Sequence, residues 1–380
     1  MATSTYTSRM RLALLVFATN VGVRVAEGGG DAITLAGGAL AAASRAEFPQ
    51  VLAHRGASGY IPEHSLGAYE TAMNLQTDYI EPDLCLTKDG VFVALHDLLL
   101  DDTTNVAELP QFATYKSTKL VEGKSMTGWF VSDFTYSETQ ELRLRQRLPF
   151  RTQVYNDFFT LPTLDQIISL AHDNFNSTNR LVGLYIELKH PAYYTGLGFN
   201  MPELLLRQLE AAGFQVGADA PKDLHQVLPL VIQCFDADTL RYLASLDSAI
   251  PRVQLLDPPT PEQLADGTYW SAESLKQIAT YAQAVGPEKT FFSAPPLAEG
   301  QAAVKAAEQA GLLMHPWTFR AEPQYIGKKF STFAEEQTYF YCCLGVAALF
   351  TEFPDQTRQV LQAGCTSTTC QGAGYDQLKL

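Results

Sequence analysis

The feature that most constrains this chain is the stretch from residue 51 to residue 97, where short apolar runs end in charged side chains. Each run has the length and composition of a buried β-strand, and glycines or a Lys-Asp-Gly turn separate the runs. Between the first two runs, residues 64–75 have the apolar spacing of a helix. The three runs with their polar residues are 51–53 with His54 and Arg55, 79–86 with Glu81 and Asp83, and 91–95 with His96. If these strands are neighbours in one sheet, their polar side chains converge.

Glu81 and Asp83 lie two residues apart on one predicted strand, so their side chains point to the same face. Two carboxylates held that close repel each other unless one binds a proton or a cation lies between them. A divalent ion is the commoner solution when both are ionised, and hard oxygen ligands favour Ca²⁺ or Mg²⁺. The pair therefore predicts a site for one divalent metal ion.

His54, Arg55 and His96 add the groups that an acid–base reaction needs. Two imidazoles can divide the roles of general acid and general base near neutral pH, and the guanidinium can hold a tetrahedral oxyanion in a bidentate manner. This combination favours cleavage of a phosphoester over acyl transfer. The chain also lacks the Gly-x-Ser-x-Gly elbow of serine hydrolases.

Seven short motifs occur here in the same order as in a known family of enzymes. They are HRGASGYIPEHS at 54–65, YIEPDL at 79–84, TKDG at 87–90, LHD at 95–97, YIELK at 185–189, QCFD at 233–236 and MHPWTF at 314–319. In these motifs the chain resembles the glycerophosphodiester phosphodiesterases, most closely their secreted and periplasmic members. Each motif alone would be a weak signal, but ordered matches over roughly residues 50 to 330 make a strong one.

The resemblance implies a TIM (β/α)8 barrel with an insertion after the third strand. It also implies metal-dependent hydrolysis of glycerophosphodiesters, such as glycerophosphocholine or glycerophosphoethanolamine, to sn-glycerol 3-phosphate and an alcohol through a cyclic phosphate. Either histidine could then serve as base or as acid. The implied metal ligands are Glu81, Asp83 and Glu187, and the implied catalytic residues are His54 and His96. Arg55 and Lys189 would bind phosphate, and Phe235 and Trp317 would either line the glycerol site or pack in the barrel. Glu63 would either support the site or cap the next helix, and His64 would be structural.

The rest of the chain has the rhythm of an eight-stranded barrel, because apolar runs and amphipathic segments alternate. Further strands are expected at 181–189, 228–235, 252–256, 290–294 and 312–319, and helices at 163–172, 202–212, 237–246, 271–285 and 302–310. The barrel is expected to span 48–330, with an insertion at about 98–160 that covers its mouth, and a C-terminal extension at 331–380. Four arginines of the insertion either attract an anionic substrate or form a solvated basic face; they are Arg143, Arg145, Arg147 and Arg151.

The N-terminus has the pattern of a targeting segment. Arg9 and Arg11 precede a short apolar run at 12–18, which is typical of a signal peptide and too short to span a bilayer. Ala41 and Ala43 form a small-residue cleavage site, so the segment is expected to cover 1–43. The boundary stays open, because an earlier site near Ala26 has Arg24 where a small residue is wanted. A secreted, periplasmic or otherwise extracytoplasmic location is preferred, and import into an organelle is the alternative. No later segment resembles a membrane span.

Four cysteines lie close together near the C-terminus, an even number that suits a disulfide clamp in an oxidising compartment. They are Cys342, Cys343, Cys365 and Cys370, of which the last two could close a small loop, although the pairing stays open. Cys85 and Cys234 lie in apolar strands and are expected to be free buried thiols.

The net charge of −14, from 41 acidic and 27 basic residues, excludes nucleic acid and anionic membranes as general partners. The expected partner is a small-molecule substrate, and the sequence leaves the oligomeric state open. One alternative is a related barrel phospholipase, of the sphingomyelinase D or phosphatidylinositol phospholipase C type, which should expose an apolar rim to lipid. Another is a secreted binding module without activity, which loss of a catalytic or ligand residue would mark.

Overall fold

The computed structural model describes residues 49–214, 216, 228–247, 249–293, 296–366, 369 and 370. The predicted targeting segment 1–43, with Arg9, Arg11, Ala41 and Ala43, lies outside these residues. Among the helices that the structure describes, none has both the length and the apolar character needed to cross a membrane.

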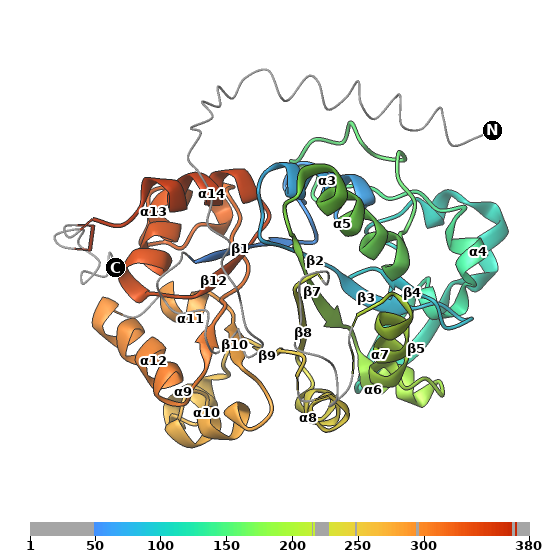
Figure 1. The fold of residues 1–380 in the computed structure, drawn as a ribbon. Coiled ribbons are helices and arrows are strands. Elements are labelled where there is room, and N and C mark those ends of the chain that lie inside the picture. The colour runs from blue at the N-terminus through green and yellow to red at the C-terminus, as the bar shows by residue number, and fades with distance from the viewer. Residues whose placement is uncertain are drawn as a thin grey trace. The chain divides into compact units, whose positions relative to one another are not determined.

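Eight parallel strands form the barrel, in the order β11-β10-β9-β8-β7-β2-β1-β12 (Figure 1). Backbone hydrogen bonds close the sheet between its two ends, from Ala347 N to Met314 O at 3.0 Å and from Phe319 N to Phe350 O at 2.8 Å. The strands are β1 (Gln50–His54), β2 (Tyr79–Glu81), β7 (Gly183–Leu188), β8 (Leu230–Cys234), β9 (Arg252–Leu256), β10 (Ala284–Pro287), β11 (Leu313–Met314) and β12 (Ala348–Thr351). The predicted TIM-barrel fold is therefore confirmed.

A small apolar layer fills the barrel interior around Tyr185, whose ring centroid lies 5.8 Å from that of Tyr79 and 5.1 Å from that of Phe350. Because strand side chains alternate, residues two positions further along each strand also point inward, one layer nearer the carboxyl end. The apolar layer consists of Leu52, Tyr79, Tyr185, Val231, Val253, Ala284, Ala348 and Phe350. The positions two residues later include His54, Glu81, Glu187 and Gln233. The alternation thus places the polar groups above a dry floor.

Pro82 separates β2 from β3 (Asp83–Leu86), and it has no N–H to donate to a ladder. β3 pairs in parallel with β7 and in antiparallel fashion with β4 (Phe92–Ala94). The run at 91–95 was predicted as a barrel strand. It is instead the hairpin partner of β3 and is not one of the eight strands of the barrel. The error arose because periodicity identifies a strand but not its neighbour.

Two further predictions of barrel strands are wrong. Residues 290–294 were expected to form a strand, but Thr290–Ser293 is helix α11, and the barrel strand is β10, which had been assigned to the end of a helix. The eighth strand of the barrel is β12, which pairs with β1. In this register Gln50 lies opposite Ala348, and Ala53 lies opposite Thr351. The expected end of the barrel at residue 330 is corrected accordingly, since β12 comes from the segment predicted as a C-terminal extension.

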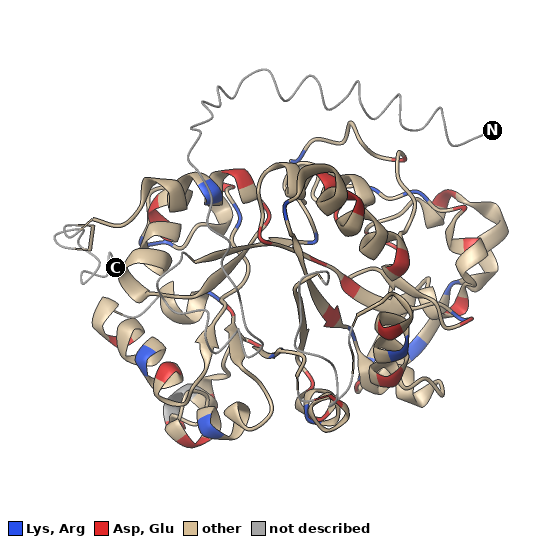
Figure 2. Ribbon diagram, viewed as in Figure 1, with Lys and Arg blue, Asp and Glu red and all other residues tan. Residues whose placement is uncertain are grey.

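Helices surround the barrel (Figure 1). The longer ones are α3 (Leu66–Asn74), α5 (Leu164–Thr178), α7 (Met201–Ala211), α8 (Ala237–Leu246), α10 (Ala272–Ala279), α12 (Leu297–Gln309) and α14 (Pro354–Ala363). Their apolar residues are buried on the side that faces the barrel, as in α5, α7 and α8. Shorter ones are α4 (Tyr136–Thr139), α6 (Pro191–Gly196), α9 (Pro261–Asp266) and α13 (Phe333–Thr338). The insertion follows β4 and contains α4 and a hairpin of β5 (Ser117–Val121) and β6 (Lys124–Gly128). Figure 2 shows acidic residues on strands of the barrel as well as on the outer helices.

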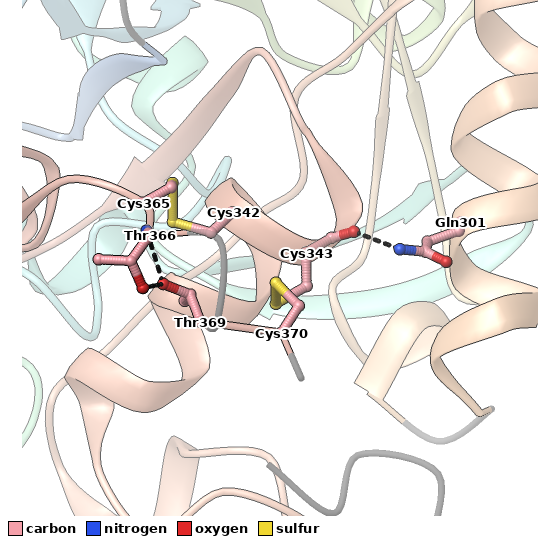
Figure 3. The surroundings of a disulfide bond; sticks show 7 residues. All are labelled: Gln301, Cys342, Cys343, Cys365, Thr366, Thr369 and Cys370. Atoms are coloured by element: carbon pink, nitrogen blue, oxygen red, sulfur yellow. Dashed lines mark hydrogen bonds between the residues drawn. A yellow bond between two sulfur atoms is a disulfide. The ribbon is translucent and has the colours of Figure 1, made fainter. Parts of the chain in front are cut away.

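Two disulfides join the C-terminal tail to the π-helical segment Tyr339–Leu344, which carries the adjacent pair Cys342 and Cys343 (Figure 3). Cys342 bonds Cys365 and Cys343 bonds Cys370, so the small loop considered between Cys365 and Cys370 does not form. The predicted disulfide clamp is confirmed, and Cys85 and Cys234 are free and buried, as expected.

Candidate active site

Three carboxylates meet at the carboxyl ends of neighbouring strands. Glu81 ends β2, Asp83 begins β3, and Glu187 lies opposite Asp83 in the register of β3 with β7. One oxygen from each lies within 4.8 Å of the other two, and all three residues are buried. The structure therefore brings together the three predicted metal ligands.

Three buried carboxylates this close repel one another, and a cation between them would offset that repulsion. Burial and the neighbouring carboxylates of Asp83 and Glu187 raise the pKa of Glu81 well above its usual value. Burial, partly offset by Lys189 and reinforced by Asp83, raises the pKa of Glu187 to about 8. Asp83 Oδ1 is buried and has no hydrogen-bond partner among the residues that the structure describes. An all-oxygen set with a spare buried oxygen suits Ca²⁺ or Mg²⁺, so these residues fit the divalent ion that the sequence predicted.

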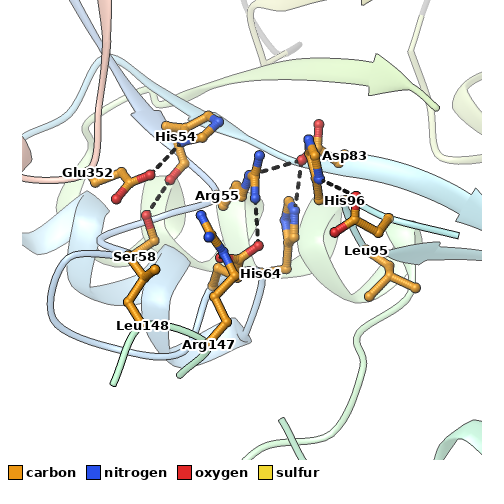
Figure 4. A network of polar contacts seen from close by, with 12 residues as sticks. His54, Arg55, Ser58, His64, Asp83, Leu95, His96, Arg147, Leu148 and Glu352 are labelled. Atoms are coloured by element: carbon orange, nitrogen blue, oxygen red, sulfur yellow. Dashed lines mark hydrogen bonds and ion pairs between the residues drawn. The ribbon is translucent and has the colours of Figure 1, made fainter. Parts of the chain in front are cut away.

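His54 lies at the end of β1, with Nδ1 3.1 Å from Oε1 of Glu352 (Figure 4). Burial and the nearby Arg55 guanidinium lower its pKa to about 3. His96 follows β4, and its Nδ1 lies 2.9 Å from Oδ1 of Asp97. Burial and the cations Arg55 and Lys189 lower the pKa of His96 to about 4. Both imidazoles are therefore neutral near pH 7, and each has a carboxylate at Nδ1.

Arg55 lies between two acidic groups (Figure 4). Its NH1 is 2.7 Å from Glu63 Oε1, and its Nε is 3.1 Å from Asp83 Oδ2. Its backbone adopts φ 60°, a left-handed conformation uncommon for arginine, and its N–H donates to Glu81 Oε2 at 2.9 Å. Backbone strain of this kind gathers at functional sites, where surrounding contacts hold it in place.

Glu63 and His64, which are adjacent in the chain, contact Arg55 and Asp83 respectively. Glu63 does not cap the following helix, because Ser65 does so by accepting from Ala68 N. Instead Glu63 holds Arg55 and, at 2.6 Å, Nε of Arg147. His64, expected to be structural, is buried and lies 3.0 Å from Asp83 Oδ2 through Nε2.

Lys189 follows β7, and its Nζ lies 2.7 Å from Glu187 Oε1 and 5.5 Å from the ring of Phe235. Phe235 in turn meets Trp317 edge to face, with centroids 5.8 Å apart. Both rings are partly exposed. Phe235 lies beside the Lys189 ammonium, and Trp317 also packs against the apolar layer below the site. The structure thus gathers all the predicted site residues at one end of the barrel.

Two contributors were missed from sequence, and for a third, Arg151, the contact it makes was not predicted. Glu352 lies just after β12 and contacts His54, and Gln233 Nε2 donates to Glu81 Oε1 at 2.7 Å. Arg151 contacts Glu352 from the insertion. The run Val346–Phe350, followed by Thr-Glu and a proline, has the same strand-then-charge pattern as the first three runs and could have identified Glu352.

The four arginines of the insertion all have partners within the protein. Arg151 is buried, so it is not part of a solvated face, whereas the other three stay partly exposed. Attraction of an anionic substrate stays a prediction. Arg143 donates to the carbonyl oxygens of Gln140 and Leu142, Arg145 pairs with Glu108 and Asp157, Arg147 with Glu63, and Arg151 with Glu322 and Glu352. Two of them therefore tie the insertion to residues that touch His54 and Arg55.

A TIM barrel with an acidic cluster, two neutral histidines and two buried cations at its carboxyl end has the equipment of a metal-assisted phosphoric ester hydrolase. The model of the glycerophosphoryl diester phosphodiesterase family matches residues 54–356. The chain belongs to this family.

Relatives agree with this membership. Glycerophosphodiester phosphodiesterase GDPD6 of Arabidopsis thaliana is 35% identical over 318 residues, which cover 80% of this chain and 84% of that protein. The glycerophosphodiester phosphodiesterase of Bacillus subtilis is 29% identical over 309 residues, 81% of this chain and 85% of that protein.

Solved structures support the fold. A phosphodiesterase from Oleispira antarctica, in complex with the product sn-glycerol-3-phosphate, matches with a TM-score of 0.55 and 21% identity, over 83% of this chain and 97% of that one. A glycerophosphodiester phosphodiesterase from Agrobacterium tumefaciens matches with a TM-score of 0.54 and 18% identity, over 82% and 100%.

Proposed function

We propose that this chain hydrolyses water-soluble glycerophosphodiesters, such as glycerophosphocholine or glycerophosphoethanolamine, to sn-glycerol 3-phosphate and an alcohol, with one Ca²⁺ or Mg²⁺ held by Glu81, Asp83 and Glu187. The observation that carries the proposal is the buried acidic cluster flanked by two neutral histidines, each with a carboxylate at Nδ1. The relatives' names and the product bound to the Oleispira antarctica structure support the substrate class.

The chain's own residues account for most of the chemistry. The bound ion would supply Lewis-acid polarisation of a phosphate oxygen. Arg55 and Lys189 offset the charge that develops around phosphorus. His54, with a side chain 9% exposed, is the base that takes the proton of the glycerol 2-hydroxyl, and attack of that oxygen gives a cyclic phosphate.

His96, with a side chain 32% exposed, is the acid, because a departing alcohol must reach solvent. A neutral imidazole cannot donate from an unprotonated Nε2, so His96 first takes a proton from solvent and passes it to the departing alcohol. Water then opens the cyclic phosphate: the now neutral His96 takes a proton from that water, and His54 returns its proton to the glycerol 2-oxygen. The partly exposed rings of Phe235 and Trp317 contact the glycerol moiety.

The metal is testable on the chain that lacks residues 1–43. Turnover of glycerophosphocholine is expected to vanish with EDTA and to return with Ca²⁺ or Mg²⁺. Glu81→Gln keeps the shape of the side chain but removes a ligand charge, so we expect kcat to fall at least about 100-fold. Glu210→Gln, on the exposed face of α7, is the matched control. Full activity in EDTA would rule out the metal-dependent reaction.

A second candidate function is favoured by one observation, the apolar side chains exposed in the insertion. Phe150, Val154 and Phe158 are 53%, 66% and 62% exposed, in a segment anchored to the site by Arg147 and Arg151. Such a rim is what an enzyme acting on lipids was expected to show. Because the nearby arginines are paired, a zwitterionic lipid suits it better than an anionic one.

If lipid is the substrate, micellar lysophosphatidylcholine should be cleaved faster than glycerophosphocholine. The triple variant Phe150→Ser, Val154→Ser, Phe158→Ser should then lose activity on micelles about 10-fold or more while keeping activity on the soluble diester. Equal loss on both substrates, or no cleavage of micelles, would eliminate this candidate.

We also propose an extracytoplasmic location, supported by the two disulfides, because such bonds persist in oxidising compartments. N-terminal sequencing of the protein secreted by its native cell is expected to begin near residue 44. An unprocessed chain with reduced cysteines would contradict this location.

A further inference from the structure

Glu352 connects the candidate base to two other parts of the chain. Its Oε1 lies 3.1 Å from Nδ1 of His54 and 2.8 Å from Nε of Arg320. Its Oε2 lies 2.5 Å from NH2 of Arg151. Glu352 is 1% exposed, so these contacts are made away from water. Both oxygens of one buried carboxylate are therefore held by groups from the barrel, the insertion and the segment after β11.

Arg151 is fixed in turn by the groups around it. Its Nε lies 2.6 Å from Glu322 Oε1, and its NH1 donates to the carbonyl oxygen of Ser58 at 3.0 Å. The hydroxyl of Ser58 donates to the carbonyl oxygen of His54 at 2.7 Å (Figure 4). Arg151 is thus linked to His54 by two indirect routes. Glu352 connects it to the imidazole ring, and Ser58 connects it to the backbone carbonyl of His54.

We propose that Glu352 and Arg151 are positioning residues for His54: Glu352 accepts from Nδ1 and so leaves Nε2 as the free base, and Arg151 of the insertion holds Glu352 in that orientation. The kinetic part of this inference rests on the proposed function. It assigns the insertion a part in catalysis in addition to covering the barrel mouth.

The charges around Glu352 determine the direction of its hydrogen bond with His54. Burial alone would raise the pKa of Glu352, but the hydrogen bond with His54 and the charges of Arg320 and Arg151 outweigh it and hold that pKa well below its usual range. An ionised carboxylate can only accept, so His54 Nδ1 must donate. Arg320 and His54 share Oε1, whereas Arg151 engages Oε2. Without Arg151, the carboxylate is free to turn toward Arg320 and away from the imidazole.

His96 provides an internal contrast. Its carboxylate partner is the next residue, Asp97, whose side chain is 49% exposed. No arginine of the insertion contacts Asp97 in the part of the chain that the structure describes. Disturbing Arg151 should therefore affect His54 and leave His96 unchanged.

Two measurements test the proposal on the disulfide-bonded chain lacking residues 1–43. Glu352→Gln keeps the shape of the side chain but removes its charge, and we expect kcat to fall about 10- to 100-fold with KM within about 3-fold. Arg151→Met should lower kcat about 10-fold, and Arg151→Lys should recover part of the loss. Because the two residues act through one contact, the double variant should be no slower than Glu352→Gln alone.

The second measurement is independent of turnover. In ¹⁵N spectra, with the His54 signals assigned by their absence in His54→Asn, wild type should show the Nδ1–H tautomer, and Glu352→Gln a mixture of both tautomers. His96 should be unchanged. Arg145→Met is the control, since Arg145 pairs with Glu108 and Asp157 within the insertion, and it should match wild type.

An unchanged His54 tautomer in Glu352→Gln would overturn the proposal whatever the activity. So would a kcat within 2-fold of wild type, or an Arg145→Met effect as large as that of Arg151→Met. If wild type cleaves no glycerophosphodiester, the proposed function fails, and the tautomer still decides whether Glu352 orients His54.

Discussion

The His54→Asn variant is expected to lose about 10²- to 10⁴-fold in kcat, the range typical for removal of a general acid–base group. Asparagine places an N–H donor near the position of Nδ1, so the contact with Glu352 can persist while Nε2 disappears. The loss should therefore fall on kcat, with KM and thermal stability close to wild type. The measurement is coupled release of sn-glycerol 3-phosphate from glycerophosphocholine.

The matched control is His172→Asn. His172 lies on α5, where its ring contacts that of Phe214, and it is not one of the candidate site residues. It should retain wild-type turnover. A His54→Asn protein that keeps more than about a tenth of the wild-type kcat would show that another group removes the proton.

The core of the site could be predicted because its charged residues stand out in short apolar segments of the sequence. Glu81 and Asp83 are two apart on one strand, and Glu187 stands at the end of another, so alternation and strand ends were enough to group them. The same holds for His54 and Arg55 at the end of β1. The structure brings the three carboxylates together, within reach of one metal ion.

Contacts between distant segments were the part that sequence patterns could not supply. Glu352 is separated from His54 by 298 positions and meets it only because β12 closes the barrel beside β1. Arg151 is 201 positions from Glu352, and its charge alone suggested solvent or substrate. A one-dimensional pattern identifies strands and charges, but which strands become neighbours is decided by tertiary packing.

The same limit explains two other differences. Residues Thr290–Ser293 include two phenylalanines with high strand propensity, yet they form α11, because the barrel strand β10 has already ended at Pro287. Four cysteines allow three pairings, and the adjacent Cys342 and Cys343 are too alike in sequence context to choose among them.

A buried ion pair outside the candidate site predicts the largest effect on stability. Nζ of Lys289 lies 2.9 Å from Glu336 Oε2 and 2.6 Å from the carbonyl oxygen of Tyr325. Lys289 is 5% exposed and Glu336 is fully buried, so the pair ties α13 to the end of β10 without water. Lys289→Met leaves the Glu336 carboxylate buried without its cation, and we expect the free energy of unfolding to fall by about 3–5 kcal/mol.

Two controls make this prediction specific. The double variant Lys289→Met, Glu336→Leu removes both charges and should recover most of the loss, since an apolar pair of similar volume can replace a buried ion pair. The pH dependence gives a sign. Burial raises the pKa of Glu336, and loss of Lys289 raises it further, so the folded variant binds a proton that the unfolded chain releases. Its deficit should therefore be smaller at pH 5 than at pH 8 in urea unfolding. A loss below about 1 kcal/mol, or a deficit that grows as pH falls, would show that the pair does not hold α13 on the barrel.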